Sequence, residues 1–291
     1  MRLTSVTAGA REFCRIADGG RVVDLPITRG VQGFLELPDW RTRASDLLAS
    51  SGTEASHTDL GSQHIDRIIA QPHNIIVVGA NTHSHLKEAG PYTDQIPPRR
   101  PMILAKSPGA MSGHRDPIIY PPETDSLDYE VELAVVIGTR ARRVAPEDVS
   151  SVIAGYTVAN DVSARNVQLS DWEDNTFYRT HYLGKSFDGF CPCGPEIVTP
   201  DEVGPLGPQR IRSWVNGELR QDSTLEDLYF SVEHLVSYVS QVLTLQPGDI
   251  LLTGSPAGVG HFHEKGYMHP GDIVRCEIEG IGVIENLVVA E

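Results

Sequence analysis

The chain has 291 residues, 40% of them hydrophobic and 22% charged, which is typical of a globular protein with one large domain or two smaller ones. Its 24 Lys and Arg residues against 39 Asp and Glu residues give a formal net charge of −15, which disfavours nucleic-acid binding because acidic surfaces repel phosphate backbones. No apolar run approaches the roughly 20 residues of a membrane span, so we expect no membrane contact. The N-terminus lacks the apolar segment of a signal peptide, so we expect a cytoplasmic protein.

Residues 1–70 are expected to form a small N-terminal lobe. Short apolar segments such as "RVVDLPITRG" and "QGFLELPDW" are broken by turn-forming residues. Residues 50–63, "SSGTEASHTDLGSQ", are rich in turn formers and predict a loop. Because this lobe contains no recognisable catalytic pattern, we expect residues 71–291 to form the catalytic domain.

The sequence changes character at "NIIVVGANTHSHLKEAG", residues 74–90. The apolar β-branched run Ile75–Val78 predicts a buried strand, and "HSHLKE" predicts a short helix that ends at Gly90. The next segment, "PYTDQIPPRRP" at residues 91–101, has four prolines and predicts an irregular loop. Active-site lids are often built from such loops on a rigid scaffold.

His85 and Glu88 are three residues apart on the expected short helix, so their side chains would share one face. A carboxylate that accepts one imidazole N–H fixes the tautomer and makes the other nitrogen a better general base. A surface helix with incidental charges explains the same pattern equally well. The pair alone therefore does not establish a catalytic dyad.

From about residue 103 strand follows strand without regular helical crossovers, which argues against a doubly wound parallel sheet. Only Thr224–Leu243 shows a clear helical pattern, and turn signals such as "VNGEL" and "QPGD" separate the remaining segments. We expect a β-rich α+β domain, a sandwich or roll with one or two helices. The expected strands are "MILAKS", "PIIY", "YEVELAVVIG", "VIAGYTVANDV", "EIVT", "RIRSWVNGEL", "DILLTG" and "DIVRCEIEGIGVIENLVV".

Two glutamates in "DYEVELAVVIG", Glu130 and Glu132, would share one strand face, and Asp161 follows the next strand-like run. Three converging carboxylates without histidine or cysteine suit a hard cation, Mg²⁺ or else Mn²⁺ or Ca²⁺. The cation would also relieve the repulsion between the carboxylates. The two-residue period alone favours a different interpretation, in which both glutamates face solvent.

Three further segments carry weaker signals. Lys185 in "GKSFDGF" could stabilise an enolate or oxyanion, although most lysines are simply solvated. In "TGSPAGVG", residues 253–260, the glycines permit close backbone approach and Thr253 could donate to a ligand carboxylate. That segment lacks the Gly-Lys-Ser/Thr ending of a phosphate loop, and neither segment has the Gly-x-Ser-x-Gly of a serine hydrolase. Cys191 and Cys193 have no second cluster at zinc-site spacing and are expected to be buried thiols.

The order of these segments over residues 72–286 resembles the fumarylacetoacetate hydrolase family. Seven blocks carry the resemblance: "VGANTHSHLKE", "DYEVELAVVIG", "GYTVANDVSARNVQ", "GKSFDGFCPCGPEIVT", "VNGELRQDSTLEDL", "LQPGDILLTGSPAGVG" and "GDIVRCEIEGIGVIEN". One departure is the dipeptide Asn81-Thr82, where the family typically has Asn-Tyr. That departure puts the shape of the substrate pocket in question, but not the chemistry.

The resemblance implies a mixed β-sandwich roll with a small N-terminal lobe, usually assembled as a homodimer. It also implies a divalent metal, usually Mg²⁺, and a His–Glu dyad on a segment that orders over the site when substrate binds. The residues that match the family positions are the metal ligands Glu130, Glu132 and Asp161, the catalytic residues His85, Glu88 and Lys185, and the substrate-binding residues Arg165, Gln168 and Thr253.

The resemblance and the residues together predict a metal-dependent hydrolase that cleaves a C–C bond in a 1,3-dicarbonyl substrate, an acylpyruvate- or fumarylpyruvate-like 2,4-dioxo acid. His85, oriented by Glu88, would activate water, and Lys185 would stabilise the departing enolate. The same site can stabilise an enolate without adding water, so the alternative is a 2-oxo-acid lyase or isomerase: an oxaloacetate-type decarboxylase, a deoxy sugar acid dehydratase or a hydroxymuconate-type tautomerase. A non-catalytic protein of the same fold is a third hypothesis, which the intact set of acidic and dyad residues disfavours.

Overall fold

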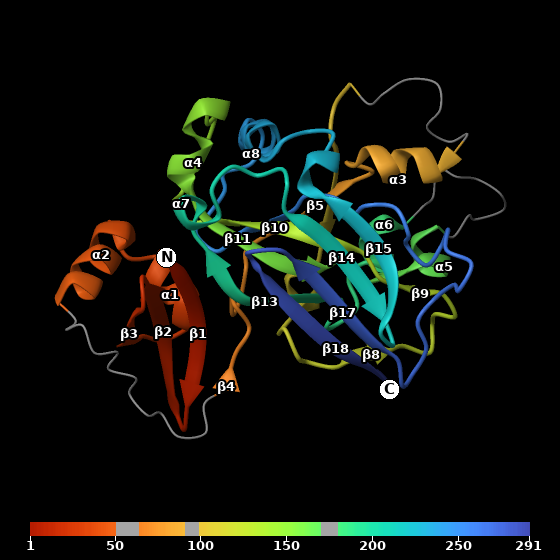
Figure 1. Ribbon diagram of the computed structural model, residues 1–291, viewed down its shortest axis with the longest axis horizontal. Coiled ribbons are helices and arrows are strands. Elements are labelled where there is room, and N and C mark those ends of the chain that lie inside the picture. The colour runs from red at the N-terminus through yellow and green to blue at the C-terminus, as the bar shows by residue number, and fades with distance from the viewer. Residues whose placement is uncertain (51–63, 91–98, 170–179) are drawn as a thin grey trace.

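The computed structural model describes residues 1–50, 64–90, 99–169 and 180–291 (Figure 1). The loop predicted at residues 50–63 therefore lies outside the described residues except for Ser50, and the loop predicted at 91–101 is described only from residue 99. Within the described residues the fold is a β-rich α+β arrangement of two main sheets, which confirms the expected fold class.

The larger sheet has eleven strands in the described part of the chain, with the main order β3-β2-β1-β13-β11-β10-β16-β5-β6. Most of its pairs are antiparallel, but β16 and β5 are parallel, as are β13 and β7. Its strands are β1 (Arg2–Ala8), β2 (Arg11–Asp18), β3 (Arg21–Pro26), β4 (His64–Ile65), β5 (Ile75–Gly79), β6 (Met102–Lys106), β7 (Met111–Ser112), β10 (Val131–Ile137), β11 (Ile153–Asn160), β13 (Cys191–Val198) and β16 (Ile250–Leu252).

A second sheet of five strands, in the order β15-β14-β17-β18-β8, packs across β10 and β11 of the larger sheet (Figure 1). Its hairpin between β14 and β15 turns at Asn216, whose φ is 53°, followed by Gly217, as the Asn-Gly signal predicts. These strands are β8 (Ile118–Tyr120), β14 (Arg210–Val215), β15 (Glu218–Thr224), β17 (Ile273–Ile278) and β18 (Gly282–Ala290); a separate two-stranded pair consists of β9 (Leu127–Asp128) and β12 (Ser163–Ala164).

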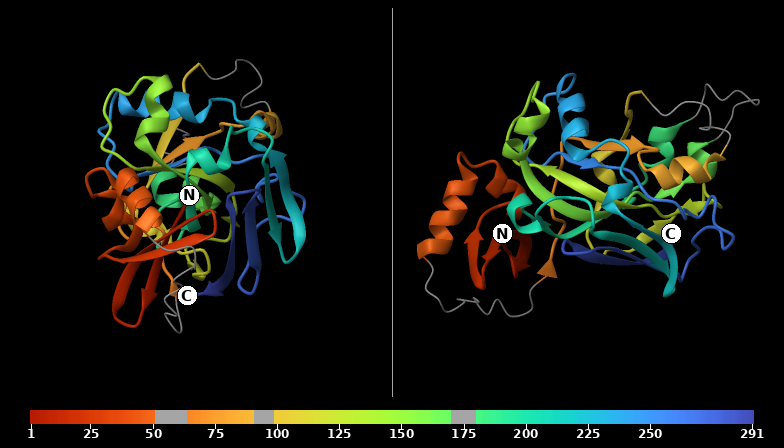
Figure 2. Two further views of the ribbon diagram at one scale, coloured as in Figure 1. Left: turned by 60° about the vertical axis from the view of Figure 1, so that its left-hand side comes forward. Right: turned by 45° about the horizontal axis from the view of Figure 1, so that its top comes forward.

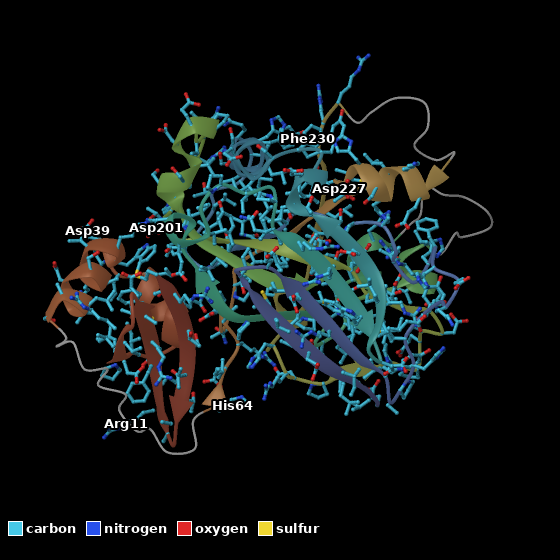
Figure 3. The ribbon with its side chains drawn as sticks, viewed as in Figure 1. Arg11, Asp39, His64, Asp201, Asp227 and Phe230 are labelled. Atoms are coloured by element: carbon cyan, nitrogen blue, oxygen red, sulfur yellow. The ribbon has the colours of Figure 1, made fainter. Side chains whose placement is uncertain are left out.

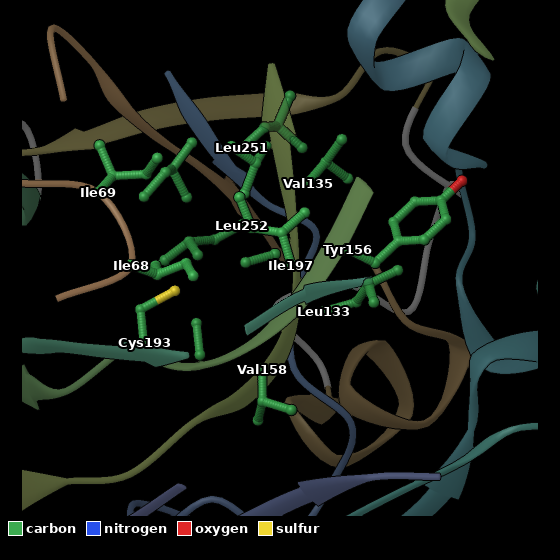
Figure 4. Close-up of a cluster of buried hydrophobic side chains, with 14 of the residues drawn as sticks. Ile68, Ile69, Leu133, Val135, Tyr156, Val158, Cys193, Ile197, Leu251 and Leu252 are labelled. Atoms are coloured by element: carbon green, nitrogen blue, oxygen red, sulfur yellow. The ribbon is translucent and has the colours of Figure 1, made fainter. Parts of the chain in front are cut away.

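The centre of the sandwich is formed by β10 and β11, in which every residue is buried. Apolar side chains from these strands, including Leu133, Val135 and Val158, join a cluster of aliphatic residues from β13 and β16 (Figure 4). Because both faces of β10 and β11 are covered, their sequences show no alternation of apolar and polar residues. All four cysteines are buried and free, as was expected for Cys191 and Cys193.

The helices are short. They are α1 (Gly30–Leu35), α2 (Trp40–Ser50), α3 (His83–Glu88), α4 (Val149–Val152), α5 (Arg165–Gln168), α6 (His181–Gly184), α7 (Pro200–Val203) and α8 (Val232–Ser240), with 3₁₀ turns η2 (Pro108–Ala110), η3 (Pro146–Asp148) and η5 (Leu225–Asp227). In the described part of the chain, none of the helices is long and apolar enough to cross a membrane.

The single helix predicted over Thr224–Leu243 is wrong in its first half. The structure has the 3₁₀ turn η5 and then α8, which begins only after Ser231 accepts a hydrogen bond from the His234 N–H at 3.3 Å. Between them, Leu228 forms a β-bridge with Thr82 and the Tyr229 N–H donates to the Asn81 carbonyl at 2.8 Å. These long-range bonds hold the segment extended despite its helical pattern.

The N-terminal lobe consists of β1, β2 and β3 with α1 and α2 packed on them (Figures 1 and 2). It is joined to the rest of the protein through β1, where Arg2 and Leu3 pair with Val198 and Ile197 of β13. The lobe therefore extends the larger sheet. The domain boundary near residue 70 stays a prediction.

Candidate functional site

The three predicted metal ligands meet where β10 begins and β11 ends. Val131 pairs with Asn160, and the Asp161 N–H donates to the Glu130 carbonyl at 2.8 Å, so the antiparallel register places the three carboxylates together. Each offers an oxygen within 4.8 Å of the others, and Glu130, Glu132 and Asp161 are only 6%, 2% and 0% exposed. The interpretation in which both glutamates face solvent is therefore wrong.

Buried cations surround two of these carboxylates. Lys106 and Lys185 each form an ion pair with Asp161, one on each carboxylate oxygen. Lys185 also binds Glu130 at 2.7 Å, and its third N–H donates to the Ser163 hydroxyl at 2.9 Å. Asp161 is therefore held from both sides, and all three N–H groups of Lys185 have acceptors.

Arg165 extends this network to a fourth carboxylate. Its Nε donates to Asp128 at 2.7 Å, and its terminal nitrogen Nη2 lies 2.9 Å from Glu130 in an ion pair without hydrogen-bond geometry. Asp128 also accepts from the backbone N–H groups of Gly260 and His261 at 2.6 and 3.0 Å. Asp128 thus ties Arg165 to the loop after residue 258.

Glu132 differs from the other members of the cluster. It accepts the Gly254 N–H at 2.5 Å but has no ion pair within the described residues. Burial, and then the charges of Asp161 and Glu130, raise the pKa of Glu132 well above its usual range. For Glu130, burial acts in the same direction but Arg165 and Lys185 outweigh it and hold the pKa well below the usual range.

The acidic cluster fits a hard divalent cation. Its donors are carboxylate oxygens alone, the ligand type that Mg²⁺, Ca²⁺ and Mn²⁺ prefer. Of the four carboxylates, counting Asp128, three pair with Lys106, Lys185 or Arg165, and Glu132 is the one without a cationic partner in the described part of the chain. A bound cation would supply the missing positive charge.

The predicted dyad forms on α3. His85 Nδ1 lies 2.6 Å from Glu88 Oε1, and the other oxygen of Glu88 accepts the Gly258 N–H at 2.8 Å. Because the carboxylate can only accept when ionised, Nδ1 carries the proton and Nε2 of His85 is left as the basic nitrogen. Thr82 caps the helix by accepting the His85 N–H at 3.2 Å, and Gly90 follows it with a φ of 60°, as its C-terminal signal predicts.

Asp227 holds the N-terminal end of α3 in place. Figure 3 shows Asp227 beside this helix. It accepts the Ser84 N–H at 3.1 Å and the Ser84 hydroxyl, and that hydroxyl accepts the Ala257 N–H at 3.0 Å. Asn81, just before the helix, donates to the Thr253 carbonyl at 2.7 Å and accepts the Phe230 N–H at 2.9 Å. The helix thus docks on "TGSPAG" and on the 3₁₀ turn η5.

His85 of the dyad and the acidic cluster line one cavity of about 100 Å³. Its walls include His85, Lys185, Arg165, Gln168 and His181, together with the three carboxylates and apolar residues of β5 and β6. Larger hollows exist on the N-terminal lobe, but none of the nine predicted site residues lines them. The structure therefore brings eight of the nine predicted site residues into one network, seven of them directly on the cavity wall.

Thr253 is the ninth predicted site residue and is placed differently. Its side chain is fully buried, and its hydroxyl donates to the Leu133 carbonyl at 3.0 Å. It is not among the residues that line the cavity, whereas Ser255 is. Gly254, between them, has a φ of 106°, and a Cβ there would lie 2.8 Å from Asn81. The glycine is therefore needed for the close approach that was expected of this segment.

Three residues of the site were not expected from the sequence. Lys106 ends an ordinary strand pattern, and nothing local indicates that it is buried against Asp161. Asp128 could have been found, because Asp128, Glu130 and Glu132 are spaced by two. His181 lies next to residues outside the described range and has no local signal; its position beside Gln168 comes from the packing of α5 and α6.

Comparisons with known proteins agree with this geometry. Residues 74–289 match the family profile "Fumarylacetoacetate (FAA) hydrolase C-terminal". The mitochondrial oxaloacetate tautomerase FAHD2B of Bos taurus is 44% identical over 223 residues, which cover 76% of this chain and 68% of the bovine protein. A crystal structure of a putative HpcE protein from Mycobacterium smegmatis superposes with a TM-score of 0.84 at 28% identity, covering 100% of this chain and 99% of that one.

A third similar protein bears on the metal. Maleylpyruvate hydrolase from Sphingobium sp. SYK-6, solved in complex with manganese(II) ion and pyruvate, has a TM-score of 0.74 and 28% identity, covering 100% of this chain and 99% of that one. The family match covers most of the chain and includes the acidic cluster, the dyad and Lys185. The chain belongs to the fumarylacetoacetate hydrolase family of enzymes.

Proposed function

We propose that this protein is a metal-dependent tautomerase that interconverts the enol and keto forms of a small 2-oxo dicarboxylic acid such as oxaloacetate. The observation that carries the proposal is a single cavity of about 100 Å³ that combines the basic nitrogen of His85, the ammonium of Lys185 and the acidic cluster. The tautomerase name of the 44% identical bovine relative supports it. The proposal takes up the alternative that the sequence left open and places hydrolysis second.

Glu130, Glu132 and Asp161 are the residues proposed to hold the metal, Mg²⁺ or Mn²⁺. When bound, such an ion would act as a Lewis acid toward the oxygens of a 2-oxo acid and lower the energy of the enolate. The manganese(II) and pyruvate in the maleylpyruvate hydrolase structure support this choice of ion and ligand.

His85 is proposed to move the proton between carbon and solvent or enol oxygen. In the keto-to-enol direction its Nε2 removes a proton from C3 of the substrate, and the enolate oxygen then takes up a proton from His85 or from solvent. In the reverse direction the enol O–H proton is lost to His85 or to solvent, and His85 places a proton on C3. Glu88 holds the ring in the required tautomer, because its Oε1 accepts the Nδ1 proton at 2.6 Å. No water molecule enters the balance of this reaction.

Lys185 and Arg165 are proposed to stabilise negative charge on the substrate. All three N–H groups of Lys185 already have acceptors, so its contribution is a fixed positive charge beside the enolate oxygen. Arg165 and Gln168 are 8% and 5% exposed and line the cavity, so they can orient a substrate carboxylate.

The size of the cavity favours a short substrate. Oxaloacetate has nine non-hydrogen atoms and a seven-carbon hydroxymuconate-like diacid has twelve, so a cavity of about 100 Å³ suits the smaller acid better. Proton transfer within oxaloacetate also needs only one base and one stabilised enolate. Both are present.

Hydrolysis of a 2,4-dioxo acid is the second candidate function. The observation that favours it is the same His85–Glu88 pair, since a carboxylate-oriented imidazole is equally suited to activate water. The similarity to maleylpyruvate hydrolase points the same way. In this reaction C–C cleavage would follow attack of hydroxide on the distal carbonyl.

The test is to follow oxaloacetate by ultraviolet absorbance of the enol, with Mg²⁺, with Mn²⁺ and with EDTA, and to identify products by NMR. We expect fast enol–keto exchange that EDTA and His85→Ala both suppress, with no carbon lost. Formation of CO₂ and pyruvate from oxaloacetate would indicate a decarboxylase, and release of acetate from acetopyruvate would indicate the hydrolase. Exchange at the uncatalysed rate would contradict the proposal.

We also propose a homodimer, as the family resemblance implies, and light scattering on the purified protein would test it. The cellular compartment stays a prediction: the sequence favours the cytoplasm, whereas the bovine relative is named as mitochondrial.

A further inference from the structure

A short loop beside the dyad, residues 258–262, is bonded to both parts of the site; we call it the strap. The Gly258 N–H donates to Glu88 at 2.8 Å, and Glu88 is the carboxylate that holds His85. Two further N–H groups of the strap donate to Asp128 at 2.6 and 3.0 Å. The strap is therefore bonded at one end to the dyad and in its middle to the network of the acidic cluster.

The backbone of the strap has little freedom. The Phe262 N–H donates to the Val259 carbonyl at 3.0 Å, and Val259 is fully buried. Gly258 has a φ of 100°, and a Cβ there would lie 2.1 Å from the Arg220 carbonyl oxygen. The fold therefore fixes the position from which the Phe262 side chain extends.

The ring of Phe262 contacts the imidazole of His85. The two ring centroids are 6.0 Å apart and the ring planes make an angle of 60°, an edge-to-face arrangement. Aromatic pairs attract at centroid separations of about 4.5–7 Å and favour this orientation. The ring of Phe262 also packs edge-on against His261 at 4.7 Å and is 43% exposed. Phe262 thus provides an aromatic contact to the histidine that is proposed to move the proton.

The hydrogen bond to Glu88 and the contact with Phe262 restrain different motions of His85. The bond to Glu88 at 2.6 Å fixes the position of Nδ1, but the imidazole can still pivot about that bond. Helix α3 has no buried residue, so its own packing does little to prevent this motion. A second contact, from Phe262, sets the plane of the ring and with it the direction of Nε2. Proton transfer to or from carbon depends on that direction.

We infer that Phe262 is a positioning residue, which aims Nε2 of His85 into the cavity through this ring contact. The strap holds Phe262 in place, and Phe262 holds the imidazole. The inference rests on the proposed function for the reaction that His85 performs, but the orientation of the imidazole can be tested separately from that reaction.

The test compares Phe262→Ala and Phe262→Leu, which remove the ring, with Phe262→Tyr, which keeps it. Leucine retains apolar bulk on the strap, and the added hydroxyl of tyrosine can reach solvent because Phe262 is partly exposed. His234→Ala is the matched control, since it removes an exposed ring that stacks on Phe230 and Tyr238 and does not line the cavity. For each protein, kcat and KM for enol–keto exchange of oxaloacetate are measured with Mg²⁺.

A second measurement does not depend on activity. The Nδ1 proton between His85 and Glu88 should give a downfield proton NMR signal that is protected from exchange with water, and His85→Ala assigns it by its loss. We expect this signal in the wild-type protein and in Phe262→Tyr. Phe262→Ala should lose it through fast exchange, because an imidazole that pivots breaks its bond to Glu88 more often.

Phe262→Ala and Phe262→Leu should lower kcat by about 3- to 10-fold, the range for an edge-to-face aromatic pair, and leave KM within twofold. Phe262→Tyr and His234→Ala should stay within twofold of the wild-type kcat. In a protein that already carries His85→Ala, Phe262→Ala should cause no further loss, because the imidazole that Phe262 positions is gone.

An unchanged kcat in Phe262→Ala and Phe262→Leu would overturn the inference, as would an equal loss in Phe262→Tyr. A further loss in the His85→Ala protein would also overturn it, because Phe262 would then act without His85. If the wild-type protein does not accelerate enol–keto exchange, the proposed function fails. The NMR signal then decides the role of Phe262, because a signal retained in Phe262→Ala would overturn the inference.

Discussion

The acidic cluster and the helix that carries the dyad are held by different means. The cluster lies between fully buried strands, and its charges are fixed by ion pairs with Lys106, Lys185 and Arg165. Helix α3 has no buried residue and is held by hydrogen bonds to Asp227 and to "TGSPAG". Substitutions in the cluster should therefore change stability and activity together, whereas substitutions on α3 should change activity alone.

The largest expected effects are those of substitutions at Glu130 and Glu132, which should both abolish most activity but change stability in opposite directions. Glu132→Gln should lower metal affinity at least ~100-fold and activity by about 10³-fold. It should nevertheless raise the melting temperature of the metal-free protein, because it removes a buried carboxylate without a cationic partner. Glu130→Gln should lose as much activity but also about 3–5 kcal/mol of stability, because Arg165 and Lys185 lose a partner.

Calorimetric metal titration and thermal unfolding in EDTA measure both effects. If only the repulsion between the two glutamates mattered, removing either one would change the melting temperature equally. Equal shifts for the two variants would therefore contradict the difference in cationic partners between Glu130 and Glu132.

The next effect concerns the dyad. His85→Ala should lower kcat by about 10²- to 10⁴-fold, the range for a lost general base, with melting temperature and metal affinity unchanged. His83→Ala is a matched control on the same helix, since its exposed ring contacts Tyr229 and does not line the cavity. A fall in melting temperature of several degrees for His85→Ala would show that α3 contributes more to the fold than its contacts indicate.

A smaller effect is expected at the anchor of α3. Asp227→Asn weakens the bonds to Ser84 and should reduce kcat by roughly 10-fold, because the helix no longer holds His85 in one place. The expected loss of stability is about 1–2 kcal/mol. Asp222→Asn removes only an exposed pair with Arg210 and should cost less than ~1 kcal/mol, without change in kcat. Equal kcat values for the two variants would contradict a positioning role.

The smallest effect concerns Thr253. If its hydroxyl serves only to bind the Leu133 carbonyl, Thr253→Val should cost about 1 kcal/mol of stability and leave KM within twofold. A several-fold rise in KM without loss of stability would instead support the substrate-binding role that the family resemblance implies. Steady-state kinetics beside thermal unfolding separates the two outcomes.

Much of the site could be predicted because its signals are local or ordered along the chain. The spacing of Glu130 and Glu132, the three-residue step from His85 to Glu88 and the helix-end signal at Gly90 all act within a few residues. The helix predicted from Thr224 failed because its first half makes bonds to Asn81 and Thr82, which lie more than a hundred residues away. The spacing of apolar residues within a segment contains no information on hydrogen-bond partners that lie far away in the chain.

By itself the sequence determined the family, the β-rich fold and the identity of the residues that carry charge and basicity. Only the tertiary structure decided which carboxylate has no cationic partner, because Lys106, Lys185 and Arg165 reach Asp161 and Glu130 but none of them reaches Glu132. It also decided that His181 lies beside Gln168. The physical reason is that burial and ion pairing depend on distances across the folded sheets, where residues far apart in the chain share one small cavity.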